Sequence, residues 1–166
     1  MPKQTKKYGS GYTLIELMIV LIIVGVLAAI ASPIFISLLS RYRLNGALQQ
    51  LLGAINESQR LAMLRGKSCK IEISPGTNDI TANKGCLLSK RRISDEITVR
   101  SNFTGKTSIT FSHKGNTTRA GTIVLSSDYT NYQKCFVIAL GTGIKRTGIY
   151  NGSKIGSVSY HNCQTI

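Results

Sequence analysis

The chain has 166 residues, of which 42% are hydrophobic, and carries a formal net charge of +14 from 21 Lys+Arg and 7 Asp+Glu. This length allows one modest domain behind a membrane segment and leaves no room for several independently folded domains. The large positive excess favours anionic partners, such as nucleic acid, anionic lipid or polysaccharide, and disfavours basic ones.

Residues 1–11 form a short hydrophilic leader that carries Lys3, Lys6 and Lys7. The apolar run behind it, from Leu14 to Ser32, is long enough to cross a bilayer as one helix. Because lysines mark the cytoplasmic flank of a span, we expect the following residues to be exported. Glu16 lies near the start of this run, where a carboxylate costs about 2.5–3.5 kcal/mol on insertion scales and therefore needs a partner.

Gly11, the aromatic Tyr12, Thr13-Leu14-Ile15 and Glu16 resemble the class III signal of type IV pilins and type II secretion pseudopilins. The resemblance implies that a prepilin peptidase cleaves between Gly11 and Tyr12 and N-methylates Tyr12. It also implies that Glu16 neutralises the positive N-terminus of a neighbouring subunit in a fibre. The alternatives are an ordinary signal anchor with an accidental Glu and a cleavable secretory signal. The second fits worse because the charged boundary precedes the apolar segment.

We expect one long helix over residues 12–65, membrane-spanning to about residue 32. Pro33 predicts a kink, and it lies where pilins usually carry a helix-kinking proline. Beyond it, apolar residues at helical spacing form a stripe for packing on a globular domain. The stripe consists of Leu44, Leu48, Leu51, Ile55 and Ala62. Gly66 is the expected end of the helix.

Residues 66–166 are expected to form a β-rich globular head, because short segments rich in Thr, Ser, Ile and Val alternate with turn residues. The expected strands are 69–74, 97–100, 108–111, 122–126 and 135–140, with weaker ones near 144–150 and 158–160. A long helix followed by a run of strands predicts an α+β fold, with an antiparallel sheet packed over the helix stripe.

All four cysteines lie on the expected exported side: Cys69, Cys86, Cys135 and Cys163. An even number of cysteines in an oxidising compartment indicates disulfides, and four cysteines allow three pairings. We favour a local Cys69–Cys86 loop together with a Cys135–Cys163 bond that pins the last residues to a preceding strand. A zinc site is the alternative, but no CxxC spacing supports it. We therefore expect neither a metal nor another cofactor.

The head resembles GspH/FimT-type minor pilins. Ser108–Phe111, Gly115 and Gly121–Leu125 are similar to their strand–turn–strand. The segment Cys135–Ile138 is similar to their closing strand, and the following Gly143-Ile144-Lys145-Arg146 resembles part of their glycine–basic turn. This resemblance implies a minor pilin of a type IV pilus, located in the bacterial inner membrane and then in the extracellular fibre. A GspH-like minor pseudopilin of a type II secretion system is the alternative.

No catalytic motif is found, since a Gly-x-Ser-x-Gly elbow and a complete phosphate loop are both missing from the sequence. We therefore expect a structural protein rather than an enzyme.

The last third contains no acid after Asp128, and its cations are Lys134, Lys145, Arg146 and Lys154. Such a cluster can bind the backbone of double-stranded DNA without reading its sequence. Some FimT-like minor pilins bind DNA through this region during natural transformation; the alternative is a basic surface used for solubility, lipid, polysaccharide or fibre contacts.

Overall fold

The computed structural model describes residues 11–74 and 76–165. The chain divides into two units, one ending at Ile36 and the other comprising Ser37–Ile166. A single helix, α1 (Leu14–Arg65), contributes to both units and contains Pro33 in its interior. The kink expected at Pro33 stays a prediction. The leader residues before Gly11 lie outside the described residues.

The end of α1 has a simple local cause. Arg65 is the last helical residue, and Gly66 follows it with a φ of +63°. A left-handed residue directly behind a helix lets the last carbonyls find partners, and glycine adopts this conformation without a Cβ clash. The helix therefore stops at the residue that the sequence predicted.

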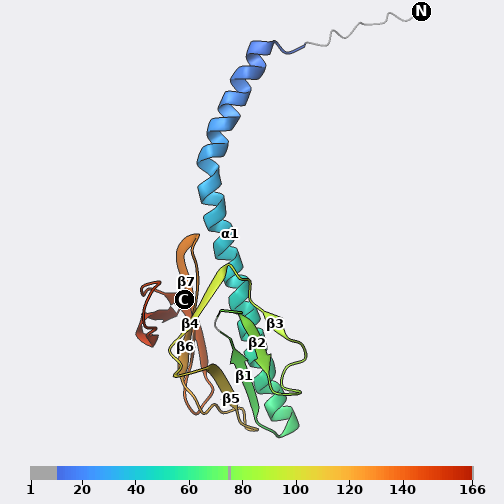
Figure 1. Ribbon diagram of the computed structural model, residues 1–166, viewed down its shortest axis with the longest axis vertical. Helices are drawn as coiled ribbons and strands as arrows, with labels where there is room; N and C mark the ends of the chain where they lie inside the picture. Colours follow the sequence, from blue (N-terminus) through green and yellow to red (C-terminus); the bar gives the residue numbers. More distant parts are fainter. Residues whose placement is uncertain (1–10, 75, 166) are drawn as a thin grey trace, which may run out of the picture. The chain divides into compact units, whose positions relative to one another are not determined.

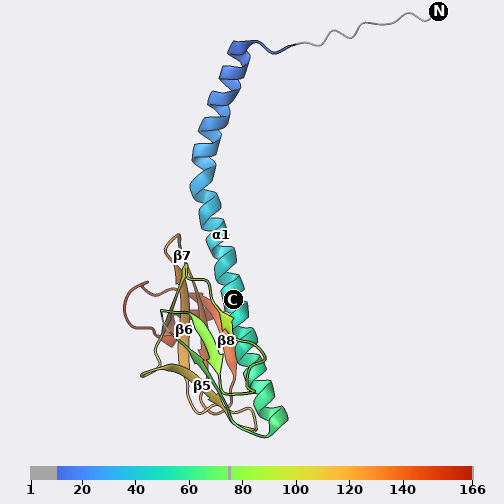
Figure 2. The ribbon, with the colours of Figure 1, turned by 45° about the vertical axis from the view of Figure 1, so that its right-hand side comes forward.

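Two antiparallel sheets follow α1, and they make up the β-rich part of the second unit (Figures 1 and 2). The first sheet has the order β3 (Arg91–Arg92), β2 (Asp79–Ala82), β1 (Cys69–Ile73) and β5 (Thr107–Phe111). The second sheet has the order β4 (Ile97–Ser101), β6 (Gly121–Ser127), β7 (Thr130–Ile138), β8 (Lys145–Tyr150) and β9 (Cys163–Thr165). A short 3-10 helix, η1 (Tyr160–Asn162), precedes β9.

The main core lies between residues 37–65 of α1 and one face of each sheet. Leu44, Leu51 and Ile55 are completely buried, as is Phe136 from the second sheet. Each such side chain stabilises the fold by about 1.5–3 kcal/mol relative to an exposed position. The five residues of the predicted stripe are all in this core. The predicted α+β fold, a long helix packed on antiparallel sheets, is confirmed.

The second sheet also buries a small core on its outer face, which we define as the face opposite α1. Successive strand residues point to opposite faces, so Val124 and Cys135 lie on the outer face while Ile123 and Phe136 face α1. The outer core consists of Val124, Cys135, Tyr150, Val158 and Cys163. The segment 151–162 supplies Val158 and so covers part of this face.

One turn of α1 is bonded to both sheets. Glu57 accepts hydrogen bonds from the backbone N–H of Leu88 at 2.6 Å and from Arg91 of β3 at 2.5 Å. On the same turn, Asn56 and Gln59 accept hydrogen bonds from Lys145 of β8. These polar contacts fix how the two sheets sit on the helix, which apolar packing alone defines less strictly.

Four details of the strand prediction are wrong. The strands β2, β3 and β9 were not expected, and residues 160–162 form η1 where a weak strand was expected near 158–160. The strands β2 and β3 are four and two residues long, and the charged Asp79, Arg91 and Arg92 hide any alternation of apolar and polar residues. The strand β2 forms because it pairs with β1, and β3 forms because it pairs with β2. Local composition does not reveal such pairing.

Candidate assembly segment and basic groups of the head

The segment Gly11-Tyr12-Thr13 lies directly before α1 and is exposed, with Tyr12 83% accessible. Thr13 caps the helix, because its hydroxyl oxygen accepts a hydrogen bond from the backbone N–H of Glu16 at 3.3 Å. Its carbonyl accepts from the N–H of Leu17 at 3.2 Å. A Thr followed three positions later by a Glu is a capping-box pattern, which favours a helix start at this place. Gly11 and Tyr12 therefore stay outside the helix.

The first part of α1 presents an apolar surface. None of its most apolar stretch is buried, and α1 is long and apolar enough to cross a membrane by length and composition. Glu16 is the one charged residue between Tyr12 and Ser40. The segment thus places a single carboxylate on the third residue of an exposed apolar helix, four positions from Tyr12.

The basic pair on β8 does not act as one cluster. Lys145 and Arg146 are neighbours on a strand, so their side chains point to opposite faces. Lys145 faces α1, where its Nζ donates a hydrogen bond to Asn56 Oδ1 at 2.5 Å and another to Gln59 Oε1. Burial lowers the pKa of the Lys145 ammonium group. Lys145 therefore holds the sheet to the helix and has little freedom to meet a partner.

The other three predicted cations are also engaged within the head. Arg146 is exposed on the outer face, and its Nη2 donates to the Tyr160 carbonyl at 3.2 Å. The Nζ of Lys154 donates to the carbonyl of Ser127 at 2.9 Å. Lys134 is only 9% exposed, with its Nζ 5.1 Å from the centre of the ring of Tyr132. Among these residues, Arg146 is the most available to a ligand.

A different set of cations gathers where α1 ends, and sequence reasoning missed it. These exposed residues, which we call the basic end, are Arg65, Lys67, Lys84 and Lys114. A Cβ on Gly85 would lie 1.7 Å from Nη1 of Arg65, and one on Gly115 would lie 2.8 Å from Sδ of Met63. The loops that carry Lys84 and Lys114 therefore pack against the last turns of the helix, and no acid of the described residues forms an ion pair with these four.

Comparisons with known proteins agree with this arrangement. Residues 6–32 match the family model of the prokaryotic N-terminal methylation motif. The chain therefore carries an N-terminal methylation motif. The apolar helix behind the motif indicates membrane anchoring.

Two solved structures share the fold of this chain. The type IV minor pilin FimU of Pseudomonas aeruginosa is 14% identical with a TM-score of 0.52, over 64% of this chain and 88% of FimU. The minor pseudopilin EpsH from the type 2 secretion system of Vibrio cholerae is 12% identical with a TM-score of 0.53, over 64% of this chain and 97% of EpsH. No curated protein sequence matches the chain.

The head contains two disulfides. Cys69 at the start of β1 is bonded to Cys86, and Cys135 on β7 is bonded to Cys163 at the start of β9. These are the two pairs favoured from the sequence. The first closes the loop that carries β2, and the second fastens the outer core to the sheet.

Proposed function

We propose that the chain is a minor subunit of a type IV pilus that is cleaved between Gly11 and Tyr12, N-methylated on Tyr12 and held in the inner membrane by α1 with its head exported. The observation that carries the proposal is Glu16, a lone carboxylate at the start of an exposed apolar helix directly behind the exposed Tyr12. An anchor that only had to stay in lipid would not need this charge.

The chemistry of assembly follows from that placement. Cleavage after Gly11 leaves the new ammonium group on Tyr12, next to the positive end of the helix dipole of α1. In a fibre of parallel helices, the Glu16 carboxylate of one subunit can neutralise the ammonium group of its neighbour. At 4 Å and an effective dielectric constant of 20, such a pair attracts by about 4 kcal/mol. This attraction sets the register, while the apolar helix surfaces supply the packing.

A minor pseudopilin of a type II secretion system is the alternative, since FimU and EpsH match this fold about equally. The large positive charge favours the pilus, whose fibre meets anionic material outside the cell. The partners proposed in either system are a prepilin peptidase and other pilin-like subunits.

Mass spectrometry of sheared surface fibres tests this proposal. In the native host we expect a mature chain that begins with N-methylated Tyr12 in the fibre fraction, because peptidase and assembly act in sequence. A Gly11→Leu variant should keep the lysine-bearing leader and remain in the membrane fraction. A mature chain that is confined to the membrane fraction, together with a secretion defect in a deletion strain, would favour the pseudopilus instead. A chain that keeps its leader in a host with a working pilus would contradict both.

DNA binding is a second candidate function, and the charge distribution favours it. Four cations of the second unit take part in ion pairs: Arg43, Lys70, Arg91 and Arg92. Most other Lys and Arg of the described residues have no acidic partner, and the basic end combines four exposed ones. We propose that double-stranded DNA is bound without sequence preference by Arg146 or by the basic end.

A salt titration of DNA affinity tests this function and locates the contact. With the full chain in zwitterionic nanodiscs, the logarithm of the binding constant should fall steeply with the logarithm of salt, because each phosphate contact contributes a slope of about −0.9. Replacing one contacting cation should make the slope shallower by about 1. We would compare the salt slope of Arg146→Gln with that of Lys84→Gln/Lys114→Gln. The variant with the shallower slope identifies the surface that contacts DNA.

Two controls sharpen the DNA experiment. Lys145→Gln changes the neighbour of Arg146 on the helix-facing side, and Lys90→Gln removes an exposed cation outside both candidate surfaces. Neither should change the slope. Undetectable binding at low salt would leave only the assembly role. A steep slope that is the same in all variants would place the DNA contact outside both candidate surfaces.

A further inference from the structure

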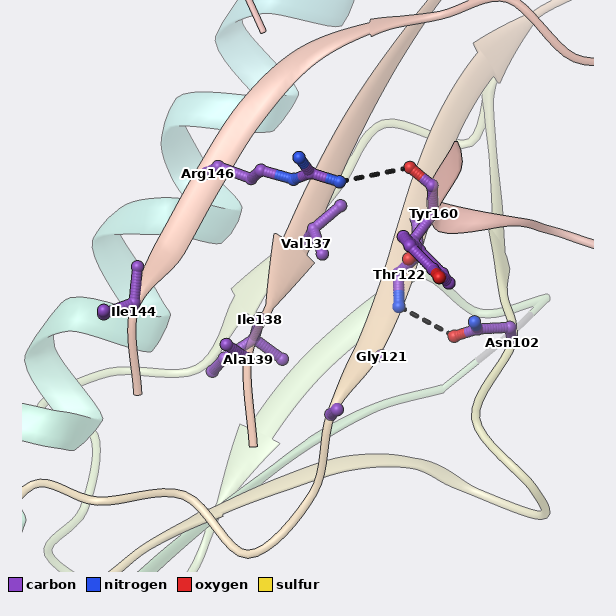
Figure 3. A pocket seen from close by; sticks show the side chains of 10 residues that line it. Asn102, Gly121, Thr122, Val137, Ile138, Ala139, Ile144, Arg146 and Tyr160 are labelled. Atoms are coloured by element: carbon purple, nitrogen blue, oxygen red, sulfur yellow. Dashed lines mark hydrogen bonds between the residues drawn. The ribbon is translucent and has the colours of Figure 1, made fainter. Parts of the chain in front are cut away.

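The segment 151–162 covers only part of the outer face of the second sheet. It is tied down by Arg100, whose Nη2 donates to the Ser153 carbonyl at 3.0 Å, and by Gln133, whose Nε2 donates to the Gly152 carbonyl at 2.8 Å. The segment leads into η1, and beyond η1 lies a cavity of about 380 Å³ at the ends of β6, β7 and β8 (Figure 3). This volume is at the lower end of the range for small-molecule sites.

The floor of this cavity is a cross-strand row with a polar group at each end. Thr122 of β6 is paired with Val137 of β7, which is paired with Arg146 of β8. Ala139 and Ile144 add further apolar surface, and Asn102 and Tyr160 complete the polar wall. Figure 3 shows Arg146 reaching across the row toward Tyr160, to whose carbonyl it donates its hydrogen bond.

Thr122 is the observation that points to a ligand. The residue is completely buried, and its Oγ1 has no hydrogen-bond partner among the described residues. Its backbone N–H is satisfied by Asn102 Oδ1 at 2.7 Å, so the hydroxyl alone is left over. Buried polar atoms normally have partners. Because the Thr122 hydroxyl is itself covered, a ligand atom in the cavity can reach it only when neighbouring side chains move aside. If no ligand bound here, valine at position 122 would give a fold of equal stability.

Charge defines which ligand fits. Among the described residues that line the cavity, Arg146 is the one charged side chain. Its guanidinium group uses one hydrogen bond on the Tyr160 carbonyl and has further N–H donors in a planar fork that matches a carboxylate. A carboxylate would balance this single positive charge, whereas a phosphate dianion would need a second cation. The apolar floor then requires a hydrocarbon body next to the acid.

We propose that the cavity is a binding site for a carboxylate carried on a short apolar body. Arg146 binds the carboxylate, the Thr122 hydroxyl donates the second hydrogen bond, and Val137 and Ile144 contact the hydrocarbon. This inference goes beyond the proposed assembly role and does not depend on it. The ligand is either a free organic acid or the carboxyl end of a polypeptide with an apolar last residue; both present the same chemistry.

Methyl NMR on the full chain in zwitterionic nanodiscs tests the site, with 4-methylpentanoate as the probe. We expect saturable shifts of the Val137 and Ile144 methyl signals, and binding at least about ten-fold weaker for 4-methylpentan-1-ol, since the alcohol lacks the charge that the guanidinium recognises. N-acetylleucine distinguishes the sources: tighter binding than 4-methylpentanoate indicates a polypeptide end, and weaker binding indicates a free acid.

Two variants separate binding from folding. Arg146→Gln should weaken 4-methylpentanoate binding about ten-fold, while Lys106→Gln, an exposed cation outside the cavity, should leave it unchanged. Thr122→Val removes the unpartnered hydroxyl, so it should weaken binding without lowering the thermal stability of the free chain. Equal affinity for acid and alcohol, unchanged binding in Arg146→Gln, tighter binding of 3-methylbutyl phosphate, or no saturation would each overturn the proposal.

Discussion

Replacing Glu16 by Gln should leave the chain in the membrane and deplete it at least about ten-fold from sheared fibres, which corresponds to a loss of about 1.4 kcal/mol in the equilibrium between membrane and fibre. Gln keeps the size of the side chain and the capping-box pattern with Thr13. The variant therefore removes the charge and little else. The measurement is the ratio of the chain in the fibre and membrane fractions, determined with an antibody against the head.

The control for this experiment is Asp128→Asn, which removes an exposed acid of the head that is not part of an ion pair in the described residues. It should be incorporated as well as the unchanged chain. Glu16→Ala, which loses both the charge and the capping group, should be depleted at least as strongly as Glu16→Gln. Normal incorporation of Glu16→Gln would show that the carboxylate charge does not set the register.

Removing the second disulfide with Cys135→Ala/Cys163→Ala should lower the free energy of unfolding of the head by about 3–4 kcal/mol. The two cysteines are 28 residues apart in sequence, so the bond restricts a long loop of the unfolded chain. Both sulfurs also belong to the outer core, and their loss loosens the packing of Val158 and Tyr150. Hydrogen exchange of the full chain in nanodiscs measures the effect, which should be concentrated in residues 151–165.

The matched variant is Cys69→Ala/Cys86→Ala, which opens a loop with a sequence separation of 17. Its expected loss is about 3 kcal/mol, and the faster exchange should appear in residues 79–93. The two double variants thus give opposite patterns along the chain. Faster exchange spread evenly over the head in both variants would contradict the assignment of each disulfide to its own segment.

The helix and the N-terminal methylation motif were predictable because their signals are local. A capping residue, an uninterrupted apolar run and a stripe at helical spacing each lie within a few turns of one another. The glycine behind α1 was recognisable for the same reason. The larger strands followed from composition. In contrast, β2 depends on pairing with β1 and β3 on pairing with β2, and these pairings supply hydrogen bonds to segments with little strand character of their own.

The candidate sites on the head were less predictable. Adjacency in sequence made Lys145 and Arg146 look like one basic pair, but strand geometry sends one to α1 and the other to the outer face. The basic end joins residues that are up to 49 positions apart, and the row of Thr122, Val137 and Arg146 exists only through strand register. Sequence periodicity contains no information on either arrangement.

The single turn of α1 that is bonded to both sheets has a mechanical consequence. If the proposed fibre is stretched, load reaches a subunit along its helix and must pass into the β-structure. Glu57 transmits this load to β3. Asn56 and Gln59 transmit it to β8 from the same turn of α1. Because one turn of the helix carries both sets of contacts, the force acts on the two sheets at the same time. The two sheets should therefore separate from α1 together under tension, and not one after the other.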